Sequence, residues 1–545
     1  MLTAHVGLAA QTPEWHWAVK AGGASADYGK SIAVDGAGNQ YLTGSFQGTA
    51  SFGPHTLSSN GSGDLFVAKL DPVGNWLWAT GAGGEFNDVG NSVALDGFGN
   101  IYLTGMIEGS AAFGALTLNS SGLNDIFAAK LDANGNWLWA VRAGGIWYDK
   151  GNDLALDGSG NAWLTGEFQD TASFGALTLN SSGESDIFAA KLDANGNWLW
   201  AVRAGGMDSD SGRGIAVDWS GNSWLTGHFT GSAAFGALTL NSSGSEDVFA
   251  AQLDPDGNWL WTVRAGGVYW DYGYGIGLDG SGNAYLTGQY AGSATFGTNT
   301  LSTIGQDEIF AAKLDSSGNW LWASGAGGMY YDSGRDIAVD GEGNSYLTGY
   351  FAGSAAFGAF ALNASGSREI FAAKLDSNGN WLWVVQAGGI NYDSGTGIAV
   401  DGAGNTWLTG WFFHYGTFGA ITLNSSGSED IYVAKLISHT PVEDELHPPS
   451  VSSVLSASPN PFSASTVIKL VGEKLEGWAG NASLVIYNLR GQEVISLSLA
   501  TAFNNGSELH WDGRDACGVP CPNGIYLALL DLGSQRAPLK LSLVK

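Results

Sequence analysis

A tryptophan-containing phrase recurs along most of this chain at a constant interval. It reads "EWHWAVKAGG" at 14–23, "NWLWATGAGG" at 75–84 and "NWLWVVQAGG" at 380–389. Its second tryptophan stands at Trp17, Trp78, Trp139, Trp200, Trp261, Trp322 and Trp383, always 61 residues apart. A fixed period of this size predicts a repeat architecture, in which each repeat is one supersecondary unit that buries its apolar faces against its neighbours.

Each repeat holds four short runs that are typical of β-strands. In the fourth repeat they are "RGIAVD" at 213–218, "NSWLTGHF" at 222–229, "DVFAAQLD" at 247–254 and "NWLWTVRA" at 258–265. Gly, Asn, Asp or Ser bounds every run, which is the strand-and-turn pattern. An all-β, seven-bladed β-propeller fits four strands repeated seven times. A solenoid is the alternative, but it needs atypical capping repeats, and the terminal repeats here match the internal ones.

The first and last repeats are offset from each other. The seventh repeat has its first three strand-like runs at 397–436 and lacks a tryptophan phrase, whereas the chain begins with one at 14–23. A closed ring explains this offset, because the N-terminal strand then supplies the fourth strand of the last blade. An open solenoid gives no reason for it.

The repeats resemble a known bacterial family. Units such as "IAVDGxGNxYLTG" followed by "DIFAAKLDxxGNWLW" are similar to the SBBP repeat, which is named for seven-bladed β-propellers, and more distantly to NHL repeats. The resemblance covers 14–437. It implies a propeller outside the cytoplasm and says little about activity.

A different β-rich segment follows a Pro- and acid-rich linker at 438–450. The motifs "PNPF" at 459–462, "IYNLRGQEV" at 486–494, "WDGRD" at 511–515 and "NGIY" at 523–526 resemble a secretion module. That module is the immunoglobulin-like type IX sorting domain, related to the flagellar hook-capping protein. The resemblance implies that 451–545 is a small β-sandwich, and that the type IX machinery exports the chain to the cell surface.

Both cysteines and the first residues bear on the compartment. Cys517 and Cys521 lie in "CGVPC", where we expect a disulfide in an oxidising compartment, with two free thiols as the alternative. Residues 1–13 have a short apolar run followed by small residues but no basic segment. This pattern predicts either the remnant of a signal peptide or a plain N-terminal extension.

Composition limits the classes of partner. The chain of 545 residues has a formal net charge of −29, which repels phosphate backbones and argues against nucleic acid. No run approaches the roughly 18–20 apolar residues of a membrane-spanning helix. Divalent cations such as Ca²⁺ are compatible with this charge, although no cofactor is certain.

Variation between repeats indicates where a ligand would bind. The three residues after "AGG" vary, as does the residue after "LTG", and in a propeller both positions lie on the face where loops gather around the channel. Aromatic side chains are frequent there and suit sugar rings or protein partners; packing between blades is the alternative. The candidate ligand-binding residues are Trp147, Tyr148, Tyr269, Trp270, Tyr330, Tyr331 and Tyr392.

One acidic position recurs beside these variable triplets. Its carboxylates would face one channel mouth and so form a possible Ca²⁺ site, but an Asp before a turn more often accepts backbone N–H bonds. We favour the structural role. The residues are Asp27, Asp88, Asp149, Asp210, Asp271, Asp332 and Asp393.

Catalysis has only weak candidates. Glu167 and His228 occupy equivalent positions in adjacent repeats, close to Lys150 and Arg213, and are candidates for an acid–base pair, with a structural hydrogen-bonded pair as the alternative. No nucleophile, metalloprotease or phosphate-loop motif accompanies them. The sequence therefore favours a secreted, non-catalytic binding or adhesion module for an extracellular glycan or surface protein. A glycan-active hydrolase or lyase, and a structural surface-layer protein, are the alternatives.

Overall fold

The computed structural model divides into two compact units, Met1–Pro441 and Val442–Lys545. It describes residues 12–437 in the first unit. In the second it describes 455–458, 460, 462–470, 483–488, 493–498, 508–516, 518–531 and 536–543. Every regular element in these residues is a β-strand, as the sequence predicts. Within them no helix has the length and apolar character needed to cross a membrane.

The first unit is built entirely from antiparallel strands. They are β1 (Glu14–Gly23), β2 (Tyr28–Val34), β3 (Gln40–Phe46), β4 (Thr49–Phe52), β5 (His55–Ser58), β6 (Asp64–Leu70), β7 (Trp76–Ala82), β8 (Val89–Leu95), β9 (Ile101–Phe113), β10 (Leu116–Leu131), β11 (Trp137–Gly144), β12 (Lys150–Leu156), β13 (Ala162–Phe174), β14 (Leu177–Leu192), β15 (Trp198–Gly205), β16 (Ser211–Val217), β17 (Ser223–Phe235), β18 (Leu238–Leu253), β19 (Trp259–Gly267), β20 (Tyr272–Leu278), β21 (Ala284–Phe296), β22 (Asn299–Leu314), β23 (Trp320–Gly328), β24 (Ser333–Val339), β25 (Ser345–Phe351), β26 (Ser354–Phe357), β27 (Phe360–Asn363), β28 (Glu369–Leu375), β29 (Trp381–Ala387), β30 (Asp393–Val400), β31 (Thr406–Phe418) and β32 (Ile421–Ile437).

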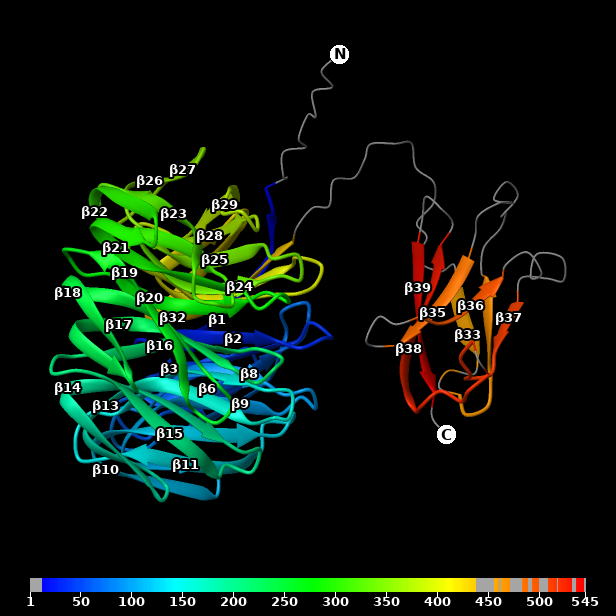
Figure 1. The fold of residues 1–545 in the computed structure, drawn as a ribbon, viewed down its shortest axis with the longest axis horizontal. Helices are drawn as coiled ribbons and strands as arrows, with labels where there is room; N and C mark the ends of the chain where they lie inside the picture. The colour runs from blue at the N-terminus through cyan, green and yellow to red at the C-terminus, as the bar shows by residue number, and fades with distance from the viewer. Residues whose placement is uncertain are drawn as a thin grey trace, which may run out of the picture. The chain divides into compact units, whose positions relative to one another are not determined.

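These strands pair in four-strand arrays, one for each 61-residue repeat. The arrays follow one another in chain order, as the colours of Figure 1 show. Neighbouring arrays pack face to face, because each buried cluster draws residues from two of them: one cluster joins Tyr102 and Ile126 to Leu164 and Phe188. The arrays are β2-β3-β6-β7, β8-β9-β10-β11, β12-β13-β14-β15, β16-β17-β18-β19, β20-β21-β22-β23, β24-β25-β28-β29 and β30-β31-β32-β1.

In five of the seven arrays the second and third strands are longer than the sequence predicts, and in the other two the extra segment forms the separate hairpins β4-β5 and β26-β27. In the fourth repeat we expected strands at 222–229 and 247–254, whereas β17 and β18 continue into a hairpin arm that pairs Phe235 with Leu238. Apolar and polar residues alternate in "SAAFGALTLN" with the two-residue period of a strand. A short turn that contains glycine interrupts this pattern, and the sequence analysis therefore missed the two strands. The end of each outer strand pairs with the arm of the next array, for example Ala143 with Phe174.

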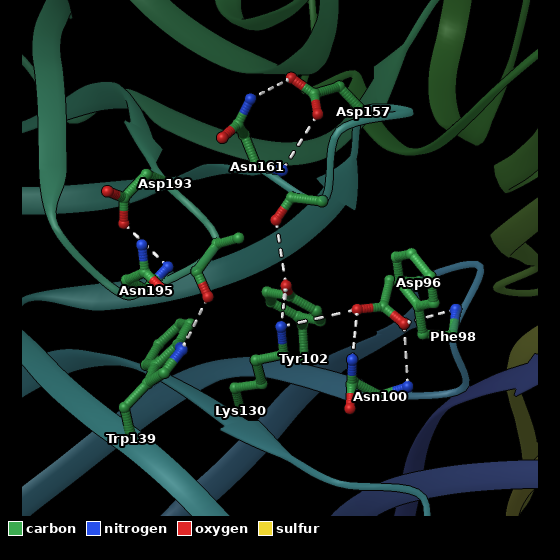
Figure 2. Close-up of polar contacts among 12 residues, drawn as sticks. Asp96, Phe98, Asn100, Tyr102, Lys130, Trp139, Asp157, Asn161, Asp193 and Asn195 are labelled. Carbon is green, nitrogen blue, oxygen red and sulfur yellow. Dashed lines mark hydrogen bonds and ion pairs between the residues drawn. The ribbon is translucent and has the colours of Figure 1, made fainter.

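Aspartates fix the tight turns between strands. The carboxylate of Asp96 accepts hydrogen bonds from the backbone N–H groups of Phe98 and Asn100, both at 2.9 Å, and from Asn100 Nδ2 at 2.7 Å (Figure 2). Lys130 Nζ lies 3.5 Å from this carboxylate and donates to the Tyr102 hydroxyl at 2.6 Å. That hydroxyl donates at 3.0 Å to the carbonyl of Gly160 in the next array. The same polar network therefore shapes the turn and joins two arrays.

The two tryptophans of each phrase have different packing roles. The first meets a phenylalanine of the arm edge-on, as Trp137 meets Phe113 with ring centroids 5.0 Å apart. The second lies on a turn glycine of the next array in six of the seven phrases, within the described residues. A Cβ built on Gly196 would stand 3.0 Å from the Trp139 ring, so the turn needs glycine here for close approach as well as for its φ of +85°.

The N-terminal strand makes both of these contacts with the last and first arrays. β1 pairs antiparallel with β32, with Ala18 opposite Ala434, and the two strands lie side by side in Figure 1. Trp15 meets Phe418 edge-on at 5.2 Å, whereas Trp17 lies on Gly74 of the first array. Ile431 and Val433 of β32 also share a buried cluster with Leu42 and Phe66.

The second unit holds two sheets around one core. The sheets are β33-β34-β37 and β36-β35-β38-β39. Phe462, Trp511 and Tyr526 are buried at their centre, with centroid distances of 5.4 Å and 5.0 Å along the series. The strands are β33 (Leu455–Ser458), β34 (Thr466–Leu470), β35 (Ser483–Asn488), β36 (Glu493–Ser498), β37 (Glu508–Trp511), β38 (Gly524–Asp531) and β39 (Arg536–Leu543).

Several expectations concern residues outside the described ones. Residues 1–11 and the linker at 438–450 are not described, so the signal-peptide interpretation stays a prediction. Cys521 is buried in the core of the second unit. Cys517 is outside the described residues, and the predicted Cys517–Cys521 disulfide stays a prediction.

The role of β1 can be tested by truncating its first tryptophan. We expect Trp15→Ala to destabilise the first unit about as much as Trp76→Ala, its equivalent in the first array, because both lose an edge-on contact with an arm phenylalanine. A Trp→Ala change in a core costs about 3–5 kcal/mol. Thermal unfolding followed by circular dichroism would measure both midpoints. An unchanged midpoint for Trp15→Ala beside a lowered one for Trp76→Ala would contradict the pairing of β1 with β32.

Candidate functional site

The predicted aromatic residues are exposed in loops that join each outer strand to the next inner strand. Trp147 and Tyr148 are 47% and 54% exposed, and the other five candidates are also exposed. The variable position after "LTG" lies at the same end of the strands, because Glu167 pairs with Lys150 at the start of β12. Both variable positions therefore border one end of the arrays.

Two of the tyrosine rings rest on turn glycines. A Cβ built on Gly353 would lie 2.6 Å from the Tyr330 ring, and one on Gly292 would lie 2.7 Å from the Tyr269 ring. One face of each ring thus covers backbone, while Tyr330 and Tyr269 remain 57% and 55% exposed. A flat aromatic surface held in this way has the geometry of a stacking platform. Trp147 differs, since Asp170, with φ of 56°, stands at the equivalent turn position.

Three of the predicted residues meet in one pocket. Tyr330, Tyr331 and Tyr392 line a cavity of about 580 Å³, together with Arg368, Gly353 and Gly366. Binding pockets for small ligands have volumes of about 300–1,000 Å³. Trp147, Tyr148, Tyr269 and Trp270 lie in other loops and do not line this pocket. We call it the tyrosine pocket.

Arg368 is a residue of this pocket that the sequence analysis missed. Its guanidinium lies 4.4 Å from the centroid of Tyr350 and 5.6 Å from that of Tyr392. The Arg335 guanidinium lies 5.2 Å from the ring centroid of the same Tyr350 and 4.5 Å from that of Tyr274. Arginine and tyrosine side chains therefore form a continuous series of cation–π contacts. The series leads from the tyrosine pocket to the innermost strands.

A second cavity lies among the innermost strands, and the sequence analysis also missed it. It has a volume of about 190 Å³ and is lined by one residue of each repeat: Lys30, Asn91, Asn152, Arg213, Tyr274, Arg335 and Thr396, with Ser31, Ser92, Asp153, Gly275 and Asp336 beside them. We call it the inner cavity. In every repeat this residue follows a glycine, and its type varies from repeat to repeat. A comparison of charge at every repeat position would have revealed it.

The seven recurring aspartates are buried one by one in their own arrays. Asp149 accepts hydrogen bonds from Gly145 N at 2.6 Å and Gln169 N at 3.0 Å. Its six equivalents bind backbone N–H groups at the same two positions, which is the arrangement that a turn-fixing role requires. Among the described residues no group of three or more His, Cys, Asp or Glu side chains is arranged to hold a metal ion.

Burial controls the protonation of these aspartates. It raises the pKa of Asp149 to about 7, against the opposing effect of the Gly145 and Gln169 hydrogen bonds; the nearby Asp125 carboxylate raises it further. The other six have the same shift for the same main reason.

Glu167 and His228 both approach Arg213 rather than each other. Arg213 Nη2 lies 3.7 Å from Glu167 Oε2, and no hydrogen bond joins Glu167 to His228 within the described residues. His228 is buried and meets Tyr272 edge-on at 4.7 Å. Burial, together with the Arg213 charge, lowers the pKa of His228 well below its usual value. The imidazole is therefore neutral near pH 7, and an arginine is shared between the two candidates.

Comparison with known proteins identifies the repeat. The SBBP β-propeller repeat family matches residues 77–110. An uncharacterised WD repeat-containing protein, L264 of Acanthamoeba polyphaga mimivirus, is 21% identical over 499 residues. That match covers 73% of this chain but only 36% of the viral protein. Regulatory protein FlaEY of Caulobacter vibrioides is 26% identical over 168 residues, which are 29% of this chain and 18% of that protein. The chain thus carries a β-propeller repeat.

Solved structures resemble the chain only in general outline. PorZ, a surface component of the type IX secretion system of Porphyromonas gingivalis, has a TM-score of 0.35 at 13% identity, covering 94% of this chain and 59% of that one. Quinohemoprotein alcohol dehydrogenase of Comamonas testosteroni has a TM-score of 0.36 at 10% identity, with 82% and 78% covered. The structure of YCF48 bound to D1 peptide has a TM-score of 0.37 at 11% identity, and the match covers 80% of this chain and 100% of that one. At these scores no activity transfers to the chain.

The raised pKa of the buried aspartates predicts an unusual pH dependence. Asp149 keeps its proton in the folded chain up to about pH 7, whereas the unfolded chain loses it near the ordinary value of 3.8. The folded state binds more protons between these values, so this group makes stability fall as pH rises from about 4 to 7. Asp149→Asn removes the titrating group. We expect the variant to lose less thermal stability than the parent between pH 5 and pH 8.

The turn residue Asp157 provides a matched control. Burial acts to raise its pKa, but hydrogen bonds from Asn161 and the charge of Lys191 outweigh burial and lower it. Asp157→Asn should therefore leave the difference between the pH 5 and pH 8 midpoints unchanged. Identical pH dependence in parent and Asp149→Asn would show that Asp149 is already ionised at pH 5.

Proposed function

We propose that this chain is a secreted, non-catalytic binding module: a closed seven-bladed propeller whose variable face takes an extracellular glycan. In this proposal residues 14–437 form the propeller, 438–450 the linker and 451–545 an immunoglobulin-like sorting domain that delivers the chain to the cell surface. The observation that carries the binding function is the tyrosine pocket. Its residues differ between repeats, whereas the turns and tryptophan contacts recur.

The contacts between the chain's ends support a closed ring of seven blades. Trp15 contacts the arm of the last array and Trp17 contacts a turn glycine of the first array. Trp76 and Trp78 make the equivalent contacts with Phe52 of their own array and Gly135 of the next. Thr396 Oγ1 in the last array donates at 2.8 Å to the carbonyl of Gly29 in the first. The innermost strand β2 also contacts both β8 and β30. The pairing of β1 with β32 covers the edge of β32, which would otherwise be free to pair with other chains.

The chemistry of the tyrosine pocket supports a glycan. Tyrosine rings present an apolar face to the C–H groups of a sugar and a hydroxyl to its oxygens. Arg368 adds a planar group of N–H donors, which pairs well with oxygen acceptors. A protein loop is the competing ligand, since tyrosine and arginine also dominate protein interfaces.

Delivery to the cell surface rests on the C-terminal motifs. Phe462 of "PNPF", Trp511 of "WDGRD" and Tyr526 of "NGIY" pack together in one core, so the segments that carry the resemblance are close in space. Trp511 Nε1 also donates to the Arg514 carbonyl at 2.9 Å. The motifs therefore serve the folding of one small domain, as a sorting domain requires.

Glycan binding is tested by removing the stacking surfaces. A glycan array probed with the full chain, with and without Ca²⁺, identifies the ligand. We expect Tyr330→Ala and Arg368→Ala each to weaken its binding at least tenfold in calorimetry, with the fold retained. Trp219→Ala is the control, because this tryptophan is 88% exposed in the turn between β16 and β17, at the other end of the strands. Equal affinity of the Tyr330→Ala variant would refute the pocket assignment.

An enzyme remains the second candidate because Glu167 and Lys150 face Arg213 at the channel end of β12. A glycan-active enzyme would release reducing or unsaturated ends from polysaccharides, and Glu167→Gln would abolish that release. We expect neither result: the parent should show no turnover. Release by the parent that Glu167→Gln abolishes would replace the binding function with catalysis. Self-association without ligand binding would indicate the third candidate, a structural surface-layer protein.

A further inference from the structure

The inner cavity gathers cations in a strongly acidic protein. The chain has 51 acidic and 22 basic residues, yet Lys30, Arg213 and Arg335 all line this cavity of about 190 Å³. Each comes from the innermost strand of a different array, at one position of the 61-residue repeat. The repeat symmetry therefore directs three positive charges toward a common space.

Other residues at the same repeat position form hydrogen bonds between neighbouring arrays. Asn91 Nδ2 donates to the carbonyl of Gly151 at 2.8 Å, and Asn152 Nδ2 donates to that of Gly212 at 2.7 Å. Thr396 forms the corresponding bond to Gly29. Asparagine is thus a natural occupant of the position with a structural role. Among the described residues Lys30, Arg213 and Arg335 form no such bond. Arg213 reaches the preceding array through its ion pair with Glu167, and Arg335 through its contact with the Tyr274 ring.

Opposite charges barely neutralise these cations. Arg213 has one carboxylate at ion-pair distance, Glu167 at 3.7 Å, and its buried Nε has no hydrogen-bond partner within the described residues. Arg335 donates to the Tyr350 hydroxyl at 3.3 Å. Lys30 Nζ lies 5.4 Å from the Tyr28 ring. No ion pair joins Lys30 or Arg335 to a carboxylate in the part of the chain that the structure describes.

The cations also repel one another. Burial lowers the pKa of Lys30 to about 8, with the charges of Lys150 and Arg335 acting in the same direction. Burial and the charge of Arg213 likewise lower the pKa of Lys150. Like charges held close in a poorly solvated space are costly unless an anion enters between them.

Two aspartates beside the cavity are already occupied by other donors. Asp153 accepts hydrogen bonds from Ser92 Oγ at 2.6 Å and Ile215 N at 2.8 Å. Asp336 accepts from Ile337 N at 2.8 Å and Ile398 N at 2.9 Å. Burial raises the pKa of Asp153 to about 6 and that of Asp336 to about 7. These carboxyl groups hold inner strands together and form no ion pair with the cavity cations among the described residues.

We propose that the inner cavity is a binding site for a small oxyanion, held by Lys30, Arg213 and Arg335. Phosphate, sulfate and the carboxylate of an acidic sugar share the required chemistry, namely several oxygen acceptors around a concentrated negative charge. Guanidinium groups bind such anions through paired N–H donors, and the unpartnered Arg213 Nε provides one. The site is separate from the tyrosine pocket and does not depend on the proposed glycan function.

Calorimetric titration of the full chain with sodium sulfate at constant ionic strength, balanced with chloride, tests this site. We expect saturable binding by the parent, and at least tenfold weaker binding by Arg213→Asn and by Lys30→Asn. Asparagine stands at the equivalent position in two neighbouring arrays, so both variants should keep the fold, which circular dichroism and the thermal midpoint would verify. Lys435→Asn is the matched control, because Lys435 lies over Trp407, away from the cavity.

Varying the pH gives a second readout. Sulfate keeps its charge above pH 4, so changes in affinity report on the protein. Lys30 and Lys150, whose pKa values are lowered, lose their protons as the pH rises. Asp153 and Asp336, with pKa values raised to about 6 and about 7, become negatively charged over the same rise. Sulfate should therefore bind more tightly at pH 6 than at pH 9. Lys30→Asn should reduce this difference.

Parallel titrations with phosphate and galacturonate distinguish the sources of the anion. Tighter binding of galacturonate than of sulfate would identify an acidic sugar, and the reverse would identify an inorganic or phosphoryl group. No binding of any of the three by the parent, or unchanged binding by both Arg213→Asn and Lys30→Asn, would overturn the proposal. Tyr330→Ala should leave sulfate binding unchanged. The oxyanion proposal and the glycan proposal can therefore be refuted independently of each other.

Discussion

Contact between each tryptophan and the following array is the constraint on which the first unit depends. In six of the seven phrases, within the described residues, the second tryptophan lies on a turn glycine of the next array, as Trp139 lies on Gly196. The ring leaves no room for a side chain at the turn, so each of these contacts sets the spacing between two consecutive arrays. Trp139 Nε1 also donates to the Ala194 carbonyl at 3.1 Å (Figure 2). Trp17 extends this spacing to Gly74, across the two ends of the repeat region.

The sequence was informative wherever a residue repeats. Strand type, the Asp-based turns and the involvement of the N-terminal strand follow from periodicity, because a scaffold contact must be built again in every repeat. The hairpin arms were missed: "SAAFGALTLN" has a short turn in the middle of a strand pattern, and we interpreted the whole segment as a loop. Only the pairing of Phe235 with Leu238 shows that both strands continue.

The functional residues were harder to predict because they repeat in position and vary in type. Tyr330, Tyr331 and Tyr392 were found, since aromatic residues in variable loops carry a recognisable signal. Their partner Arg368 was not found. It lies at the base of an arm, 24 residues before Tyr392, and only the backbone bridge between these two residues brings them together. No spacing rule in the sequence connects those positions.

Charge placement separates the scaffold from the cavities. Most acidic groups are committed to backbone amides in turns, where each carboxylate replaces a missing backbone partner. The basic groups divide into two sets. Lys130 and its equivalents lie against turn aspartates and tyrosines, as in the Asp96 network. Lys30 and Arg213 have weaker partners, the Tyr28 ring at 5.4 Å and the Glu167 carboxylate at 3.7 Å, and Arg335 lies over the rings of Tyr274 and Tyr350. Asn91 and Asn152 show that a neutral, hydrogen-bonded side chain fits the same position. Folding therefore does not require a positive charge at this position, and its presence in three arrays is the pattern expected of residues that serve a ligand.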